Sequence, residues 1–338
     1  MNIGSHKAMV LLSGGLDSSL AACIVRDLGI ELSGIHFTNV FNGNYDGGAM
    51  PESIRCCADE IGIPAEVEDV SAELLELVAS PPHGHGAHLN PCIDCRIMAL
   101  RRAWRHAQRT GAEFLVTGEV LGQRPMSQRR GALDIIDRET GIGDRILRPL
   151  SAKHLKPTEP ERLGWVDRSK LLEIKGRGRK TQLGMAEKLG LKSYGTPAGG
   201  CLLTEAFFSA KVKDLMEHGD LNCENIMILR AGRSYRGPGG ELIIVGRNEE
   251  QNARLAALVR PGDEVLSARE SSPLTVLRPG GSSAGRQAAA RITARHCKAR
   301  GGPSVEILYG PALDEWAGSV VVAPAGEDMV GAMRTGRS

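Results

Sequence analysis

The chain has 338 residues, of which 41% are hydrophobic and 24% charged, which is typical of a folded protein and excludes wholesale disorder. The 42 basic and 40 acidic residues nearly cancel, so global charge cannot attract a polyanion, and any contact with nucleic acid must come from local clusters. No apolar run approaches the length of a membrane helix, and residues 1–9 lack the apolar stretch of a secretion signal, so we expect no membrane contact and a cytoplasmic location.

The first half of the chain alternates short apolar runs with helical patterns. We expect strands at residues 8–12, 31–37, 64–67 and 114–117, and helices at residues 18–28, 52–61, 72–78 and 93–110. Parallel strands joined by crossover helices build a sheet whose ligands bind beyond the carboxyl ends of the strands. The predicted fold class is α/β, with a doubly wound parallel sheet over residues 1–150.

The second half predicts three further segments. Residues 151–218 read as a basic helical extension. After it, short strands at residues 226–229, 242–245, 305–308 and 320–322 surround helices at residues 249–259 and 284–296. This pattern predicts a smaller C-terminal α+β domain over residues 219–325, and the polar residues 326–338 predict a mobile tail.

A phosphate-binding loop follows the first predicted strand, where residues 13–19 read Ser-Gly-Gly-Leu-Asp-Ser-Ser. The two glycines let the backbone curl, so that its amides and the N-terminus of the next helix converge on one point that suits an anion. Ser13, Ser18 and Ser19 add hydroxyl donors, and Asp17 is placed to hold a magnesium ion. The alternative is a plain capped helix start, which accounts for one polar residue but not for the whole string.

These residues resemble the pyrophosphate loop of the ATP-pyrophosphatase (PP-loop) superfamily, which includes GMP synthetase, asparagine synthetase and the tRNA thiouridine synthases. The resemblance implies that ATP is split between its α and β phosphates and that AMP is left on a carbonyl oxygen. Residues 117–123, Thr-Gly-Glu-Val-Leu-Gly-Gln, with Ser127 and Gln128 after them, resemble a segment of the thiamine-linked 4-thiouridine synthases, and residues 148–150 match their closing strand. The ATP-binding residues implied are Ser13, Gly14, Gly15, Asp17, Ser18, Ser19, His36, Phe37, Gly118 and Gln123, with His36 and Phe37 flanking adenine.

Three cysteines form the second candidate centre. Cys92 and Cys95 open the long predicted helix, and Cys201 follows Gly199 and Gly200. A Cys-x-x-Cys pair at a helix start brings two sulfurs within reach of one metal centre, and the helix N-terminus favours thiolate. Three thiolates suit a [4Fe–4S] cluster with one iron left open for an exogenous sulfide.

The string Asn-Pro-Cys-x-x-Cys resembles the matching segment of tRNA 2-thiouridine synthases, and its first cysteine resembles the iron–sulfur thiolases of the same superfamily, in which three cysteines in this order ligate the cluster. Two alternatives stay open. Cys95 and Cys201 could form a persulfide or disulfide pair without iron. Structural zinc would need a fourth ligand, either Cys223 or a histidine of residues 82–88.

Basic residues flank the proposed cysteines in sequence and are where phosphates of an RNA would lie. The candidate RNA-binding residues are Arg101, Arg105, Arg109, Lys175, Arg177, Arg179 and Lys180. Residues 242–252 read as strand, turn and capped helix and resemble the RNA-binding module of ribosome-quality-control factors. We find no trace of the N-terminal RNA-binding region that thiamine-linked 4-thiouridine synthases carry.

Taken with these resemblances, the sequence predicts a tRNA uridine thiolase, an ATP-dependent sulfurtransferase that forms AMP and pyrophosphate. Its expected catalytic residues are Asp17, Cys92, Cys95 and Cys201, with ATP, Mg²⁺ and a [4Fe–4S] cluster as cofactors and tRNA and a sulfur donor (sulfide or a carrier) as partners. A homodimer is left open. The alternatives are a sulfur transferase or amidase acting on a small molecule, thiolation through a persulfide, and a non-catalytic RNA-binding protein, which the retained Asp17 and cysteines disfavour.

Overall fold

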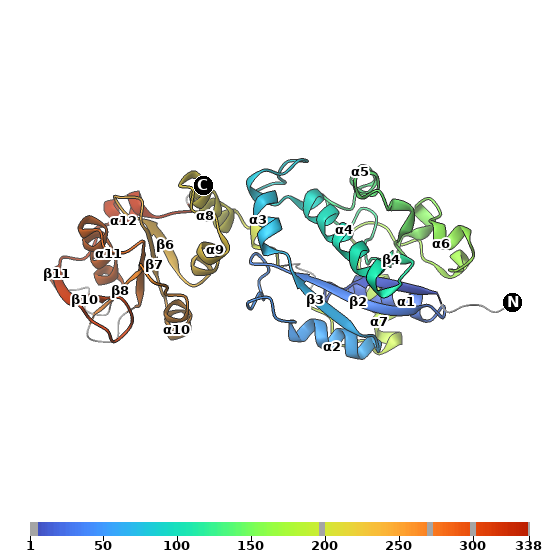
Figure 1. The fold of residues 1–338 in the computed structure, drawn as a ribbon, viewed down its shortest axis with the longest axis horizontal. Helices are drawn as coiled ribbons and strands as arrows, with labels where there is room; N and C mark the ends of the chain where they lie inside the picture. Colours follow the sequence, from blue (N-terminus) through green and yellow to red (C-terminus); the bar gives the residue numbers. More distant parts are fainter. Residues whose placement is uncertain (1–5, 196–199, 269–272, 298–301, 337–338) are drawn as a thin grey trace. The chain divides into compact units, whose positions relative to one another are not determined.

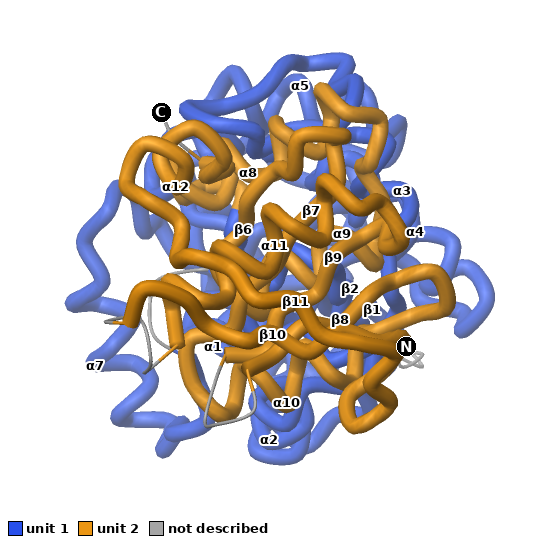
Figure 2. The backbone as a smooth tube through the Cα atoms, turned by 90° about the vertical axis from the view of Figure 1, so that its left-hand side faces the viewer, with its two compact units in different colours: residues 1–202 blue, residues 203–338 orange. Residues whose placement is uncertain are grey.

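The computed structural model describes residues 6–195, 200–268, 273–297 and 302–336, which fold into two compact units. The first unit spans Met1–Leu202 and the second Leu203–Ser338, drawn in separate colours in Figure 2. The sequence suggested a division at residue 218. The structure divides the chain earlier because helix α8 (Ala206–Glu217) buries Phe208, Val212 and Leu215 in the second unit.

The first unit is built on a five-stranded sheet in the order β3-β2-β1-β4-β5 (Figure 1). All neighbouring strands are parallel. The strands are β1 (Lys7–Leu11), β2 (Glu31–Thr38), β3 (Ala65–Asp69), β4 (Phe114–Val116) and β5 (Ile146–Leu147). The predicted doubly wound parallel sheet is therefore confirmed, and its ligand edge is the one where these strands end.

Helices cover both faces of this sheet because side chains along a strand alternate between the two faces. In β1, Ala8 and Val10 join a core with α1 (Leu16–Arg26) and α2 (Glu52–Ile61), whereas Met9 and Leu11 join a second core with α4 (Cys92–Thr110) and α5 (Arg130–Thr140). Helix α3 (Ser71–Ala79) precedes α4. Helix α7 (Lys180–Leu189) packs against α1 and adds Ala186 to the first core.

The segment expected to be a helical extension is only partly helical. Besides α7 and α8 it contains the single turn α6 (Glu159–Arg162) and short 3₁₀ turns at Ala152–His154, Arg168–Lys170 and Leu202–Thr204. Gly176 and Gly178 lie in the stretch without helix before α7, and Gly190 ends α7 in a left-handed conformation.

The second unit holds a six-stranded antiparallel sheet in the order β11-β10-β8-β9-β7-β6. Its strands are β6 (Arg233–Arg236), β7 (Leu242–Val245), β8 (Glu264–Ala268), β9 (Thr275–Arg278), β10 (Val305–Gly310) and β11 (Gly318–Val322). Helix α11 (Ser283–His296) packs against this sheet through an alanine-rich face. A C-terminal α+β domain is thus confirmed, although β6, β8 and β9 were not predicted.

Two sequence predictions in this unit are wrong. Residues 226–229 form part of helix α9 (Cys223–Arg230) rather than a strand, because the Asn222 side chain caps the helix by accepting from the Asn225 amide. Within the supposed mobile tail, residues 327–333 form helix α12 (Glu327–Met333), whose Met329 and Met333 pack against the core of the sheet.

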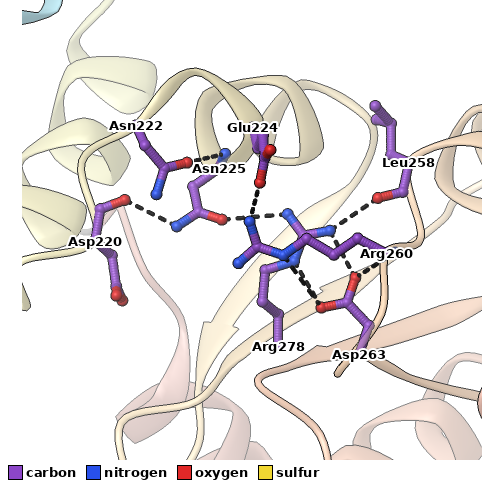
Figure 3. Close-up of polar contacts among 8 residues, drawn as sticks. All are labelled: Asp220, Asn222, Glu224, Asn225, Leu258, Arg260, Asp263 and Arg278. Atoms are coloured by element: carbon purple, nitrogen blue, oxygen red, sulfur yellow. Dashed lines mark hydrogen bonds and ion pairs between the residues drawn. The ribbon is translucent and has the colours of Figure 1, made fainter.

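A buried arginine ties the parts of the second unit together (Figure 3). Arg278 donates from Nε and Nη2 to the Asp263 carboxylate at 2.8 and 2.6 Å, and from Nη1 to Asn225 Oδ1 at 3.2 Å. Its Nη2 also donates to the Leu258 carbonyl, at the C-terminal end of α10 (Glu249–Ala257), at 2.8 Å. Nearly every polar atom of this buried ion pair therefore has a hydrogen-bond partner, as is required of a buried pair that stabilises a fold.

None of the helices in the described part of the chain is long and apolar enough to cross a bilayer.

Candidate active site

The loop between β1 and α1 has the shape of an anion site. Gly14 is left-handed, with φ +68°, and a Cβ there would lie 2.8 Å from Ile54 Cδ1, so this turn requires glycine. Ser18 Oγ braces the loop by donating to the Gly15 carbonyl at 2.8 Å and accepting from the Ser13 amide at 3.2 Å. The N-terminus of α1 follows at once, and its free backbone amides favour negative charge.

The three serines of the loop do not share one role. Ser13 is exposed, whereas Ser18 and Ser19 are buried. Ser19 Oγ lies 3.2 Å from the Gly15 carbonyl and 3.0 Å from Cys57 Sγ, so it faces the core. Ser13 is thus the exposed serine of the three, with its Oγ 3.1 Å from Ser18 Oγ, and the hydroxyls of Ser18 and Ser19, expected as donors to phosphate, brace the loop.

Asp17 lies in the first turn of α1 and is only partly buried. Its Oδ2 accepts from Arg179 Nη2 at 2.9 Å and from Gln123 Nε2 at 3.1 Å. Its Oδ1 is buried and has no hydrogen-bond partner among the described residues. A carboxylate oxygen in this state fits a hard cation such as Mg²⁺, which takes oxygen ligands.

The loop after β4 packs directly on the loop after β1. A Cβ on Gly118 would lie 2.4 Å from the Ser18 amide nitrogen and 2.5 Å from the Asp17 carbonyl carbon, so only glycine permits this approach. Gln123 reaches Asp17 from the same loop. The two motifs singled out in the sequence therefore meet at the carboxyl edge of the sheet.

A network of buried ion pairs fixes the loop after β4. Glu119 Oε1 accepts from Arg96 Nε, and its Oε2 accepts from Arg148 Nε, both at 2.8 Å. Arg148 also pairs with both oxygens of Asp137, at 2.7 and 3.1 Å. Burial opposes ionisation of Glu119, but Arg96 and Arg148 outweigh it and lower its pKa to about 2. Sequence reasoning missed this network because nothing in the spacing of these residues indicates that they meet.

His36 and Phe37 point to opposite faces of β2. Phe37 packs on the core formed with α4, so its neighbour His36 faces the α1 side. His36 Nδ1 donates to the Leu12 carbonyl at 2.8 Å, and its Nε2 is buried with no partner among the described residues. Burial lowers the pKa of His36. The two side chains therefore lie on opposite faces of β2, and their place beside adenine stays a prediction.

Two of the three cysteines lie in the first turn of α4. Cys92 is its first residue, where its Sγ accepts from Asn90 Nδ2 at 3.2 Å. The Cys95 amide donates to the Pro91 carbonyl at 2.8 Å, which begins the helix. The N-terminus of a crossover helix lies at the carboxyl edge of a parallel sheet, which is the edge that carries the phosphate loop.

Cys201 is held beyond the end of β2. It forms a β-bridge with Asn42, and the flanking Leu202 amide donates to the Phe41 carbonyl at 2.9 Å. Gly200 is described and its carbonyl accepts from the Gly43 amide at 2.8 Å, whereas Gly199 lies outside the described residues. The Cys201 segment is thus tied to this sheet edge by backbone bonds.

Cys92 and Cys201 both act on Cys95. Burial, and after it the nearby Cys201 and Cys92, raise the pKa of Cys95 to about 12. Such an effect requires the sulfurs to be neighbours, since Coulomb interactions fall with distance. Over residues 6–195, 200–268, 273–297 and 302–336, no three His, Cys, Asp or Glu side chains are arranged to hold one metal ion. The donor chemistry suits a cluster, whereas the positions of the three thiols are not those of a formed one.

The zinc alternative finds little support in the neighbouring side chains. His83 Nδ1 pairs with Asp94 Oδ1 at 2.6 Å, and His85 Nε2 donates to the Val78 carbonyl at 2.8 Å. Cys223 belongs to α9 of the second unit.

The seven basic residues expected to bind RNA divide into two groups. Arg101, Arg105 and Arg109 are exposed, four residues apart along one face of α4, and Lys175, Arg177 and Lys180 are also exposed. Arg179 is partly buried and bonds Asp17 in the phosphate loop. Six of the seven positions are therefore accessible to a polyanion, and the seventh lies at the candidate nucleotide site.

A further cationic cluster, which sequence reasoning missed, lies in the second unit. Burial, and after it the charges of Arg247 and Arg334, lower the pKa of Lys211 to about 8. Burial and the same two arginines also lower the pKa of Arg233. No ion pair with an acid is found for these residues in the described part of the chain. Phe207, with 43% of its surface exposed, carries Lys211 Nζ and Arg334 Cζ at 5.0 and 5.8 Å from its ring centre.

Comparison with known families gives one match in each unit. Residues 4–155 match the family described as thiamine biosynthesis protein (ThiI), and residues 232–333 match the family described as NFACT protein RNA binding domain. The second match includes all of residues 242–252, the stretch that resembled such a module in sequence.

Curated relatives cover part of the chain. The tRNA-specific 2-thiouridylase MnmA of Syntrophotalea carbinolica is 34% identical over 117 residues, which are 32% of this chain and 33% of the relative. The enzyme of the same name from Roseiflexus sp. is 27% identical over 208 residues, 56% of each chain. This chain thus spans between a third and somewhat over half of these relatives. Among solved structures, a 4-thiouridine synthetase–RNA complex with bound ATP is 25% identical, covers 55% of this chain and 50% of that chain, and has a TM-score of 0.35.

Proposed function

We propose that this protein, whose residues 4–155 form a ThiI-like PP-loop domain related to tRNA thiouridylases and whose residues 232–333 match an RNA-binding domain, is an ATP-dependent tRNA uridine thiolase. The observation that carries the proposal is the meeting of the two PP-loop motifs at Asp17. Gly118 packs on the Asp17 backbone, and Gln123 bonds the Asp17 carboxylate at 3.1 Å.

In the proposed reaction, ATP binds with its phosphates on the amides of residues 13–19 and the N-terminus of α1. Asp17 would hold the magnesium ion through Oδ1, which has no hydrogen-bond partner among the described residues. The carbonyl oxygen of a uridine attacks the α-phosphate, the bond to the β-phosphate breaks, and pyrophosphate leaves with its charge held by the loop. The adenylated carbon of the base is then electrophilic. A sulfur nucleophile adds to it and AMP departs.

The cysteines would supply that sulfur. A [4Fe–4S] cluster held by Cys92, Cys95 and Cys201 would provide sulfide as the nucleophile. The backbone bonds that tie Cys201 to the sheet edge where Cys92 and Cys95 begin α4, and the effect of Cys92 and Cys201 on the pKa of Cys95, support this assignment over a scheme in which Cys92 is a bystander. Cluster formation also has to deprotonate Cys95, whose raised pKa makes that step favourable only with the positive charge of a metal nearby.

The cysteine assignment is tested by iron content. Anaerobically reconstituted wild type should show the broad visible absorption of a cluster, and Cys201→Ala should lower both absorption and bound iron several-fold. Cys56→Ala is the matched control, because Cys56 is exposed on α2 and lies outside the proposed site. Zinc without iron in the wild type, or full iron in Cys201→Ala, would contradict the assignment.

Transfer RNA is the proposed polyanionic partner. Two sets of cations support it. The first unit has the exposed arginines of α4 and the basic run at residues 175–180. The second unit has Arg233, Arg247 and Arg334, which form no ion pair with an acid among the described residues, and the exposed Phe207. Cations that lack acidic partners are free to neutralise phosphates, and an exposed aromatic ring can stack on an unpaired base.

The nucleotide step has its own test. Asp17→Asn should abolish the formation of AMP and pyrophosphate from Mg·ATP in the presence of tRNA, because the metal loses its charged ligand. Asp27→Asn is the control, since Asp27 is exposed at the other end of α1, and it should retain turnover. Turnover retained in Asp17→Asn would remove Asp17 from the metal site.

A further inference from the structure

Arg179 differs from the basic residues around it. Lys175, Arg177 and Lys180 are exposed, whereas Arg179 is partly buried with its Nη2 2.9 Å from Asp17 Oδ2. Its position is fixed by the backbone, because the Gly176 amide donates to the Leu121 carbonyl at 2.7 Å and the Gly195 amide donates to the Gly14 carbonyl at 2.9 Å. The segment that carries Arg179 is thus bonded to both loops of the nucleotide site.

The ion pair between Arg179 and Asp17 is incomplete. Arg179 Nε and Asp17 Oδ1 are both buried, and neither has a hydrogen-bond partner in the described part of the chain. Arg148, in the same unit, has a partner for each of its guanidinium nitrogens, as a purely structural ion pair does. Its Nε bonds Glu119, and its two terminal nitrogens bond both oxygens of Asp137. Buried polar atoms left without partners are costly, so their persistence beside a glycine-rich loop indicates that a ligand completes them.

The surroundings favour a ligand of negative charge. Arg179 is the N-cap residue of α7, and Asp17 is in the first turn of α1. The contact between the two side chains therefore places two helix N-termini side by side, each with free amides and a partial positive charge. Asp17 is the acid that Arg179 contacts in this structure. A magnesium ion bound at the site would replace Arg179 as the partner of that carboxylate.

We propose that Arg179 is a phosphate-binding residue of the nucleotide site, which pairs with Asp17 when the site is empty and with the β- and γ-phosphates of Mg·ATP when it is filled. The inference rests on the proposed function. In the filled site Asp17 would hold the magnesium ion, and the Arg179 guanidinium would turn its Nε and a terminal nitrogen to the phosphate oxygens. A planar arginine suits this exchange because it binds carboxylate and phosphate with the same pair of donors. After cleavage, the same group holds the pyrophosphate.

The test is binding by titration calorimetry on the full chain, with Mg·ATP, Mg·pyrophosphate and AMP as separate probes. Arg179→Gln should weaken the binding of Mg·ATP and of Mg·pyrophosphate at least tenfold. It should change the affinity for AMP by less than twofold, because AMP lacks the phosphates that Arg179 contacts. Arg179→Lys keeps the charge and should recover part of the loss. Lys188→Gln is the control: it removes an exposed cation at the far end of the same helix and should bind all three probes as the wild type does.

The outcomes separate the two proposals. Equal affinity of wild type and Arg179→Gln for Mg·ATP and Mg·pyrophosphate overturns the role of Arg179 and leaves the proposed function standing. A wild type that binds neither probe overturns both. If Arg179→Gln instead weakens RNA binding, and does so to the same extent as Arg177→Gln, then Arg179 belongs to the RNA-binding surface and the inference fails. Should Arg179→Gln not fold, Arg179→Lys with the same probes decides.

Discussion

At the scale of single residues, Glu119 shows how charge fixes the loop that carries Gly118 and Gln123. The carboxylate is 4% exposed and lies between two guanidinium groups, so ionisation is favoured in spite of burial. A buried charge left without its partner is strongly destabilising, whereas an exposed pair contributes little.

Substitution of this residue has a defined cost. Glu119→Gln should lower the free energy of unfolding at pH 7 by about 3 kcal/mol or more, because Arg96 and Arg148 keep their buried charge and lose its partner. Asp144→Asn, which breaks the exposed pair with Arg162, should cost less than about 1 kcal/mol. Urea denaturation followed by circular dichroism measures both, and equal losses in the two variants would contradict the network.

The lowered pKa of Glu119 predicts that the stability of the fold depends on pH. The folded-state pKa of about 2 lies below the ordinary value of 4.5, so the contribution of Glu119 is fully present above pH 4.5 and is lost as the pH falls toward 2. The wild type should therefore lose more stability than Glu119→Gln over that interval. Parallel stability curves for the two proteins would show that Glu119 does not titrate as described.

At the scale of elements, the functional edge is made by loops that approach one another closely. The loops after β1 and β4 touch at Gly118, where any side chain would collide with the backbone of residues 17 and 18. Loops at the ends of parallel strands carry function because a rigid sheet positions them.

Gly118→Ala should therefore weaken Mg·ATP binding by tenfold or more, since the added Cβ would have to displace the first turn of α1. Gly131→Ala is a matched control, because a Cβ there meets nothing within 4 Å, and helical alanine is favoured over glycine. Fluorescence titration with a labelled ATP measures both variants. Unchanged affinity in Gly118→Ala would mean that the nucleotide does not use this junction.

A feature of the fold or of the candidate site could be predicted from the sequence where it depends on residues that are close together along the chain. The α/β fold class and the two glycine-rich motifs follow from short runs of residues, and the structure confirms the fold class. The order of the strands was not predicted, because it depends on contacts between residues far apart in the sequence. The contact between Arg179 and Asp17 could not be found in this way, because the two residues are far apart in sequence, and a basic run has the same sequence pattern whether it faces solvent or a carboxylate. Helix α9 was mistaken for a strand because its apolar run is short, and the cap at Asn222 decides its conformation.

At the scale of the whole molecule, cations in both units are available for RNA although the net charge is only +2. Arg109 lies about 21 Å along α4 from Cys95, given the rise of a helix. The basic face of α4 can therefore contact RNA well away from the thiols while a single unstacked base enters the site.

The second unit makes a separate prediction about RNA. The double variant Arg247→Glu and Arg334→Glu should weaken tRNA binding at least tenfold at low salt and reduce the salt dependence by about two counterions. Arg254→Glu, on the exposed face of α10, is the control and should stay within about twofold, because Arg254 already has Glu250 near it. Fluorescence anisotropy over a range of salt concentrations gives both numbers. An unchanged salt slope in the double variant would place the RNA elsewhere.

The most direct measurement combines the nucleotide and the thiols in one reaction. Reconstituted protein is mixed anaerobically with an unmodified tRNA transcript, Mg·ATP and sulfide, and the digested RNA is analysed for thiolated nucleosides by mass spectrometry, with AMP counted in parallel. The account predicts one thiouridine for each AMP in the wild type and no thiouridine in Cys201→Ala. Thiouridine formed equally by Cys201→Ala, or AMP formed by the wild type without any thiolated nucleoside, would contradict it.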